Sequence, residues 1–159
     1  MRSIINPFIN TSGYNCFGCS PNNENGLRMV FFEDENEVVA EWTPDGRFQG
    51  YGNVLHGGIQ ATLMDELASW YIYVKMDTAG VTSGMEIKFL KPVFTNSGPV
   101  KVCAGFRDRQ KNIINISTRL EDNTGKICSE AIVSYFTYPE KIARERLHYP
   151  GKDAFFSRK

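Results

Sequence analysis

The sequence predicts an α+β protein in which one long helix packs on one face of an antiparallel β-sheet. The chain has 159 residues, the usual size of one domain. One long segment, about residues 57–76, has a helical pattern, and strand patterns precede and follow it. Because the strands that follow are joined by short turns, we expect antiparallel pairing rather than a doubly wound parallel sheet.

Six segments have the composition of β-strands. Residues 27–32 follow the turn Asn25-Gly26, and residues 37–42 follow a short acidic turn. Residues 43–55 are rich in Gly and contain Pro44, so we expect a loop there. The strands expected after the helix are 83–90, 100–107, 112–120 and 127–138.

The chain divides into one domain and two short flanking segments. Residues 1–25 are rich in Asn and are expected to be irregular, and residues 26–138 form the domain. Residues 139–159 are expected to hold a short polar helix, up to residue 147, and a tail that contains Phe155-Phe156. The pattern leaves open whether that tail docks on the domain.

Composition excludes several classes of protein. Hydrophobic residues make up 42% of the chain, enough for a core. The 18 basic and 18 acidic residues balance, so a general binder of nucleic acid or of anionic membranes is not expected. No apolar run is long enough to span a bilayer or to act as a signal peptide. We therefore expect a soluble, cytoplasmic protein.

Four cysteines are present, and two of them form a C-x-x-C pair at Cys16 and Cys19. A zinc site normally needs a second close pair, whereas Cys103 and Cys128 are far apart in strand-like sequence. A redox pair normally opens a helix, but here turn residues follow. The spacing favours structural cysteines and predicts no metal and no cofactor, with zinc or redox chemistry as weaker alternatives.

The helix pattern is apolar on two opposite faces, which is unusual for a helix on a protein surface. One face is an ordinary core stripe formed by Ile59, Leu63, Leu67, Trp70 and Val74. The opposite face is small and apolar with one carboxylate, and is formed by Gly58, Ala61, Asp65, Ala68 and Ile72. Since one sheet covers one side only, we expect a second chain on the other, as a homodimer in contact near Asp65.

A carboxylate on such a face needs hydrogen-bond donors or a chemical role, because an unpaired buried carboxylate is costly. Asp65 is therefore a candidate catalytic residue, with a satisfied interface Asp as an equal alternative. Its neighbour Glu66 lies at the edge of the core stripe, where solvent contact or a salt bridge is the more ordinary role.

The start of the helix, His56-Gly57-Gly58, lacks the usual Ser, Thr or Asp cap. Two glycines in a first turn destabilise a helix by about 1 kcal/mol each. They also expose backbone N–H groups at the positive end of the helix, where an oxyanion can bind. A tight loop-to-helix entry and a structural His56 are the plain alternatives.

Three segments resemble a known family. Residues 56–66, HGGIQATLMDE, resemble the H-G-G-x-x-A-x-L-x-D signature of hot-dog fold thioesterases, in the branch typified by phenylacetyl-CoA thioesterases. Residues 16–27 resemble the C-F-x-C-G-x-x-N-x-x-G-L opening of bacterial members, with Ser20 in place of a Gly. Residues 83–92 resemble the strand ending in F-x-x-P that follows the helix.

The resemblance implies a long helix wrapped by an antiparallel sheet, and a homodimer, able to pair into a homotetramer, with active sites built from both chains. Asp65 matches the catalytic carboxylate, acting as general base or nucleophile. Gly57 matches the N–H that polarises the thioester carbonyl from the partner chain. His56 matches a residue that holds that carbonyl or orders the loop, and Thr82 matches a residue that positions water.

A second group of residues is expected to contact substrate. Some members carry an Asn or Gln six or seven residues before the His, which makes Gln49 the candidate polar helper and Asn53 a weaker one. Gly58 and Glu66 complete the expected binding set.

The sequence thus predicts an acyl-CoA thioesterase without a cofactor. A hot-dog hydratase or dehydratase would need a free His beside an acid, and only His56 and His148 exist. A non-catalytic acyl-CoA sensor is the third alternative, although no helix-turn-helix or basic recognition segment is evident and Asp65 argues for catalysis.

Overall fold

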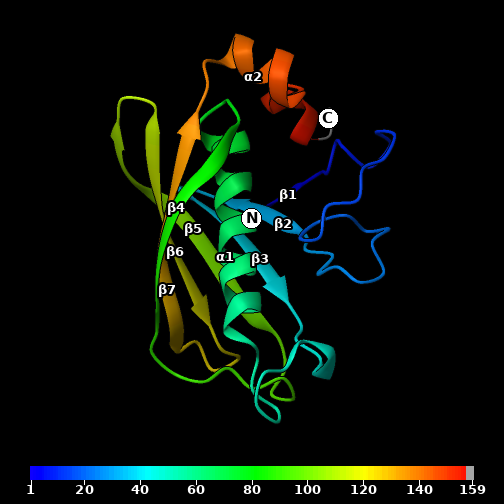
Figure 1. Ribbon diagram of the computed structural model, residues 1–159, viewed down its shortest axis with the longest axis vertical. Helices are drawn as coiled ribbons and strands as arrows, with labels where there is room; N and C mark the ends of the chain where they lie inside the picture. Colours follow the sequence, from blue (N-terminus) through cyan, green and yellow to red (C-terminus); the bar gives the residue numbers. More distant parts are fainter. Residues whose placement is uncertain (157–159) are drawn as a thin grey trace.

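One long helix lies on one face of a seven-stranded sheet in the computed structural model, which describes residues 1–156 (Figure 1). The central helix α1 spans Gly57–Lys75, ending one residue before the predicted end. The strands are β1 Arg2–Ile4, β2 Phe31–Asp34, β3 Glu37–Trp42, β4 Gly80–Phe89, β5 Val100–Gln110, β6 Ile113–Glu121 and β7 Ile127–Thr137.

Every pair of neighbouring strands is antiparallel, in the order β1-β2-β3-β5-β6-β7-β4. The strand after the helix, β4, therefore lies at one edge of the sheet beside β7, and three strands separate it from β3. This arrangement confirms the α+β prediction. None of the helices in the described part of the chain is long and apolar enough to cross a membrane.

The first strands differ from the prediction. Residues 27–30 are not in a strand, because the N–H groups of Leu27 and Met29 donate to the carbonyls of Phe17 and Gly18, at 2.8 and 2.9 Å. Residues 1–25 are also not wholly irregular, since β1 pairs with β2. The loop over 43–55 contains one 3-10 turn, Gly46–Phe48.

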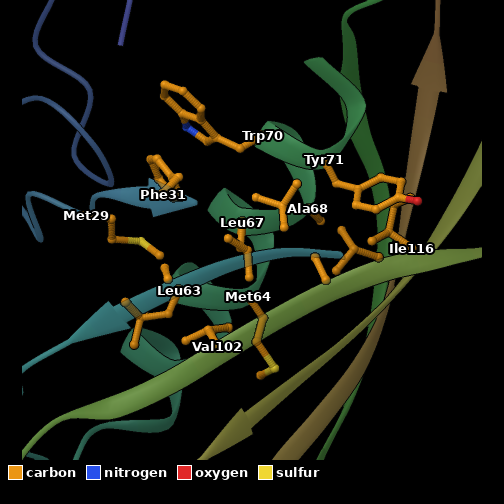
Figure 2. Close-up of a cluster of buried hydrophobic side chains, with 14 of the residues drawn as sticks. Met29, Phe31, Leu63, Met64, Leu67, Ala68, Trp70, Tyr71, Val102 and Ile116 are labelled. Carbon is orange, nitrogen blue, oxygen red and sulfur yellow. The ribbon is translucent and has the colours of Figure 1, made fainter. Parts of the chain in front are cut away.

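The core forms where α1 meets the sheet. Leu63, Leu67 and Trp70 are buried as predicted, while Ile59 is only partly buried. Figure 2 shows Phe31 beside Trp70 on one side of the helix, where their rings stack with centroids 4.2 Å apart.

The second face of α1 is only partly available to another chain. Ala68 and Ile72 are 0% and 1% exposed within this chain, which corrects the expectation that a partner covers them. The reason is that the sheet curves around the helix, which contacts all strands from β3 to β7. Gly58, Ala61 and Asp65 remain at least partly exposed, so the uncovered part of this face is its N-terminal half.

The C-terminal segment docks on the domain. After the short helix α2, Glu140–Leu147, the 3-10 turn Lys152–Phe155 brings Phe155 against Trp70 and Tyr73, with ring centroids 5.6 and 5.4 Å apart. The Phe155 carbonyl accepts a hydrogen bond from the N–H of Ile5 at 2.8 Å. Residues 157–159 of the predicted tail lie outside the described residues.

We predict that Phe155→Ala lowers the free energy of unfolding by about 3–5 kcal/mol, the usual cost of truncating a buried Phe. Phe155 is 0% exposed and joins the two ends of the chain to α1. Denaturant unfolding measures the effect, and Tyr51→Ala, at an 88% exposed aromatic, is the matched control. A loss below about 1 kcal/mol, typical of a surface change, would show that the tail is not part of the core.

Candidate active site

The Asp65 carboxylate is held between α1 and the edge of the sheet. Thr82 of β4 donates a hydrogen bond from Oγ1 to Asp65 Oδ1 at 2.8 Å. The Tyr135 hydroxyl of β7 lies 2.9 Å from the same Oδ1 and 2.8 Å from the Asp65 carbonyl oxygen. Both contacts involve Oδ1, and Oδ2 accepts no hydrogen bond from residues 1–156, so this oxygen is available for chemistry.

The sequence prediction missed Tyr135. Side chains of β7 alternate between the two faces of the sheet, and Tyr135 is on the buried face between Val133 and Thr137. A buried Tyr needs a partner for its hydroxyl, so the strand pattern indicates that a partner exists but not that it is Asp65. Burial, and next the negative charge of Asp65, raise the pKa of Tyr135 well above its ordinary value. Tyr135 therefore stays protonated and remains a donor.

His56 caps α1 in place of the missing Ser, Thr or Asp. Its Nδ1 accepts a hydrogen bond from the N–H of Gly58 at 2.9 Å. Its carbonyl accepts from the N–H groups of Ile59 and Gln60, at 3.0 and 3.1 Å. Because Nδ1 is an acceptor, the neutral imidazole of this exposed residue carries its proton on Nε2, which can act as a donor.

These contacts leave one free donor in the first turn of α1. Of the first four N–H groups, those of Gly58, Ile59 and Gln60 all bond to His56. The N–H of Gly57 has no hydrogen-bond partner among the described residues. Gly57, rather than Gly58, is therefore the donor that an oxyanion at this helix end would meet.

The loop before the helix forms an open pocket of about 400 Å³ at this point. The Gln49 side-chain carbonyl accepts a hydrogen bond from the N–H of Asn53 at 3.1 Å, which leaves the Gln49 amide nitrogen free to donate. Asn53 is in the left-handed region, with φ of 61°, so it shapes the turn. The pocket is lined by Gly50, Tyr51, Val54, Leu55, His56 and Gly57.

Glu66 is not part of this group. Its Oε1 accepts a hydrogen bond from Trp70 Nε1 at 3.1 Å and lies 3.5 Å from Cys16 Sγ. The side chain thus faces the N-terminal segment, away from Thr82 and Tyr135. No ion pair involves Glu66 in the described part of the chain, so the expected salt bridge is also not formed there.

Asp65 and Gly57 do not meet within one chain. They are eight residues apart on one helix, which separates them by about 12 Å. Strand β4 runs antiparallel to this part of α1 (Figure 1). Thr82 contacts Asp65 at one end. Phe89 lies beside Gly57 at the other end, where a Cβ added to Gly57 would lie 3.2 Å from the Phe89 ring. One small carbonyl group cannot contact both residues of the same chain.

Comparisons with known proteins agree with this fold. A family model described as the thioesterase superfamily matches residues 52–129, a segment that contains the helix start, Asp65 and Thr82. The match covers just under half of the chain, and together with the fold described above it makes the chain similar to the hot-dog thioesterase superfamily. A comparison with curated protein sequences found no match.

Solved structures share the fold at low sequence identity. A thioesterase superfamily protein superposes on this chain with a TM-score of 0.70 at 17% sequence identity. The match covers 76% of this chain, and this chain spans only 59% of that protein. The PaaI protein of the E. coli phenylacetic acid degradation operon gives 0.63 at 21% identity, with 72% and 82% coverage. A Streptococcus mutans protein bound to acetyl CoA gives 0.63 at 18% identity, with 70% and 88% coverage.

We predict that His56→Ala lowers the free energy of unfolding by about 0.5–2 kcal/mol, the usual cost of losing an N-cap. Asn is a favoured N-cap residue, so His56→Asn restores the bond to the Gly58 N–H and is expected to keep most of the stability. Denaturant unfolding compares the two variants. Equal losses in both would show that the His56 side chain does not stabilise α1 as a cap.

Proposed function

We propose that this protein is an acyl-CoA thioesterase that hydrolyses a thioester to a free acid and CoA. The observation that carries this proposal is the Asp65 carboxylate, fixed at Oδ1 by Thr82 and Tyr135 with Oδ2 free. The unpartnered Gly57 N–H supplies the complementary oxyanion donor. The structural neighbour bound to acetyl CoA supports a CoA ester as the substrate class.

We propose that a homodimer completes the site. β4 is an edge strand of ten residues that exposes apolar side chains, with Val81 46% and Phe89 54% exposed, and such an edge is suited to pairing with another strand. If two copies of β4 pair antiparallel about Met85, Thr82 of one copy lies near Phe89 of the other. Each Asp65 then approaches the partner's Gly57.

The chemistry follows from this arrangement. The thioester carbonyl oxygen accepts a hydrogen bond from one chain's Gly57 N–H, and one such donor stabilises the developing oxyanion by about 3–4 kcal/mol. As general base, the other chain's Asp65 takes a proton from water as the water oxygen attacks the carbonyl carbon. The tetrahedral intermediate then expels the CoA thiolate, which takes up the proton.

As nucleophile, Asp65 instead attacks the carbonyl carbon, and water hydrolyses the resulting anhydride after the thiolate leaves.

Thr82 donates its hydroxyl proton to the Asp65 carboxylate in both routes. Thr82 therefore orients the carboxylate, and only its hydroxyl oxygen is free to accept a hydrogen bond from the water. His56 lines the pocket, and we propose that its Nε2 and the free amide nitrogen of Gln49, in the loop before the helix, donate to the substrate. Pairing of dimers into a tetramer and a cytoplasmic location remain predictions.

We predict that the purified protein releases free thiol from acyl-CoA esters, and that Asp65→Ala lowers turnover at least about 10²-fold by removing the acid–base group. A disulfide dye measures the thiol across a panel of acyl chains. Glu140→Ala, at an exposed carboxylate on α2, is the control and is expected to keep full activity. Tight acyl-CoA binding without thiol release across the panel would favour a sensor instead.

We predict that Gly57→Pro lowers turnover about 10²–10³-fold, because it removes the single oxyanion donor. Pro is tolerated at the first position of a helix, and His56, with ψ of 134°, has the backbone conformation that precedes Pro. Gly57→Ala adds the same contact with Phe89 but keeps the N–H, so it is the matched control and its turnover is expected to fall far less. Equal losses of turnover in both variants would contradict the role of the Gly57 N–H as oxyanion donor.

Mixing the two inactive variants tests the shared site. A heterodimer of Asp65→Ala and Gly57→Pro chains contains one site with both groups intact, so random exchange is expected to restore about a quarter of wild-type activity. Size-exclusion chromatography with light scattering confirms the dimer. No restoration after confirmed chain exchange would show that each site lies within one chain.

A further inference from the structure

A second group of reactive side chains lies on the other side of α1, between the helix and the N-terminal segment. It consists of Cys16, Cys19 and Glu66, whose ligand atoms all lie within 4.8 Å of one another. Glu66 is 50 residues from Cys16 in the chain, and its Oε1 lies 3.5 Å from Cys16 Sγ. Cys103 and Cys128 lie in β5 and β7 and are not members of this group.

We propose that Cys16, Cys19 and Glu66 bind a zinc ion. Thiolate and carboxylate ligands in a tetrahedral site lie about 3.6 Å apart, given Zn–S near 2.3 Å and Zn–O near 2.1 Å, which matches the measured Sγ–Oε1 distance. Two soft thiolates favour zinc over magnesium or calcium. Water fills the fourth position on the side of Cys16, the more exposed of the two cysteines.

The loop that carries the cysteines is shaped around the carboxylate. A Cβ on Gly18 would lie 2.5 Å from both Cδ and Oε2 of Glu66, so only glycine lets the carboxylate reach this depth. The Gly18 carbonyl accepts from the N–H of Met29, and Trp70 Nε1 donates to Glu66 Oε1 at 3.1 Å. The three ligand groups are thus held in place before a metal binds, as in sites with supporting hydrogen bonds.

Cys19 also has a supporting group. The Tyr14 hydroxyl lies 2.9 Å from Cys19 Sγ and accepts a hydrogen bond from Asn6 Nδ2 at 3.0 Å. Because Asn6 occupies an oxygen lone pair, the phenol proton is free to point at the sulfur. A donor in this position stabilises a metal-bound thiolate.

The acidic groups of this cluster favour binding of a cation. Glu66 is partly buried and forms no ion pair with a Lys or Arg in residues 1–156, so its negative charge is uncompensated. A divalent ion would offset two of the three negative charges that this carboxylate and the two thiolates carry together. Its structural effect would be to fasten the N-terminal segment to α1, independently of the thioesterase reaction.

The test is metal binding by the full chain. Reduced protein is loaded with zinc, excess metal is removed, and zinc per chain is measured by elemental mass spectrometry. One zinc per chain is expected for wild type and for the control Cys103→Ser, and little or none for Cys16→Ser or Cys19→Ser. Glu66→Gln keeps an acceptor for Trp70 and is expected to lower zinc affinity at least about tenfold.

Cobalt loading of wild type keeps the test independent of whether the cysteine variants fold. A sulfur-to-cobalt charge-transfer band with tetrahedral d–d bands would support the site. Wild-type protein without zinc and without this band would overturn the proposal, and so would full zinc occupancy in Cys16→Ser. A Cys16–Cys19 disulfide that persists under the reducing conditions, shown by two missing thiols, would also overturn it.

Discussion

The antiparallel alignment of α1 and β4 is the constraint on which the candidate site depends. The hydrogen bond from Thr82 to Asp65 fixes one end of this pair, and the contact between Phe89 and Gly57 fixes the other. The Asp65 carboxylate and the Gly57 N–H are thereby held beside the β4 edge of the sheet, but too far apart to act on one carbonyl. The twofold arrangement about β4 that we propose would resolve this separation, since it exchanges the two ends.

Adjacent carboxylates of α1 serve different parts of the molecule. Asp65 and Glu66 are consecutive, so their side chains diverge by about 100° around the helix axis. Asp65 faces Tyr135 and the sheet edge, whereas Glu66 faces Cys16 and the N-terminal segment. Phe155 of the C-terminal segment packs on Trp70 and therefore supports the helix that carries both groups.

Periodicity was sufficient to predict α1 and the strands after it, because these segments combine strong apolar patterns with clear turns. It failed for residues 27–30, because the N–H groups of Leu27 and Met29 donate to the Cys16–Cys19 loop. It also failed for Ala68 and Ile72, which the curved sheet covers. Asp65 and the helix start were recognisable from local sequence. Tyr135 and the proximity of Glu66 to the cysteines were not, because those contacts join segments that are far apart in the chain.

We propose that one thioester carbonyl is held between two chains. A crystal structure of the protein with a non-hydrolysable acyl-CoA analogue tests it most directly. We expect the carbonyl oxygen to lie within hydrogen-bond distance of one chain's Gly57 N–H, and the carbonyl carbon to face the other chain's Asp65 Oδ2. An analogue bound with its carbonyl remote from Asp65, or contacted by both residues of a single chain, would contradict it.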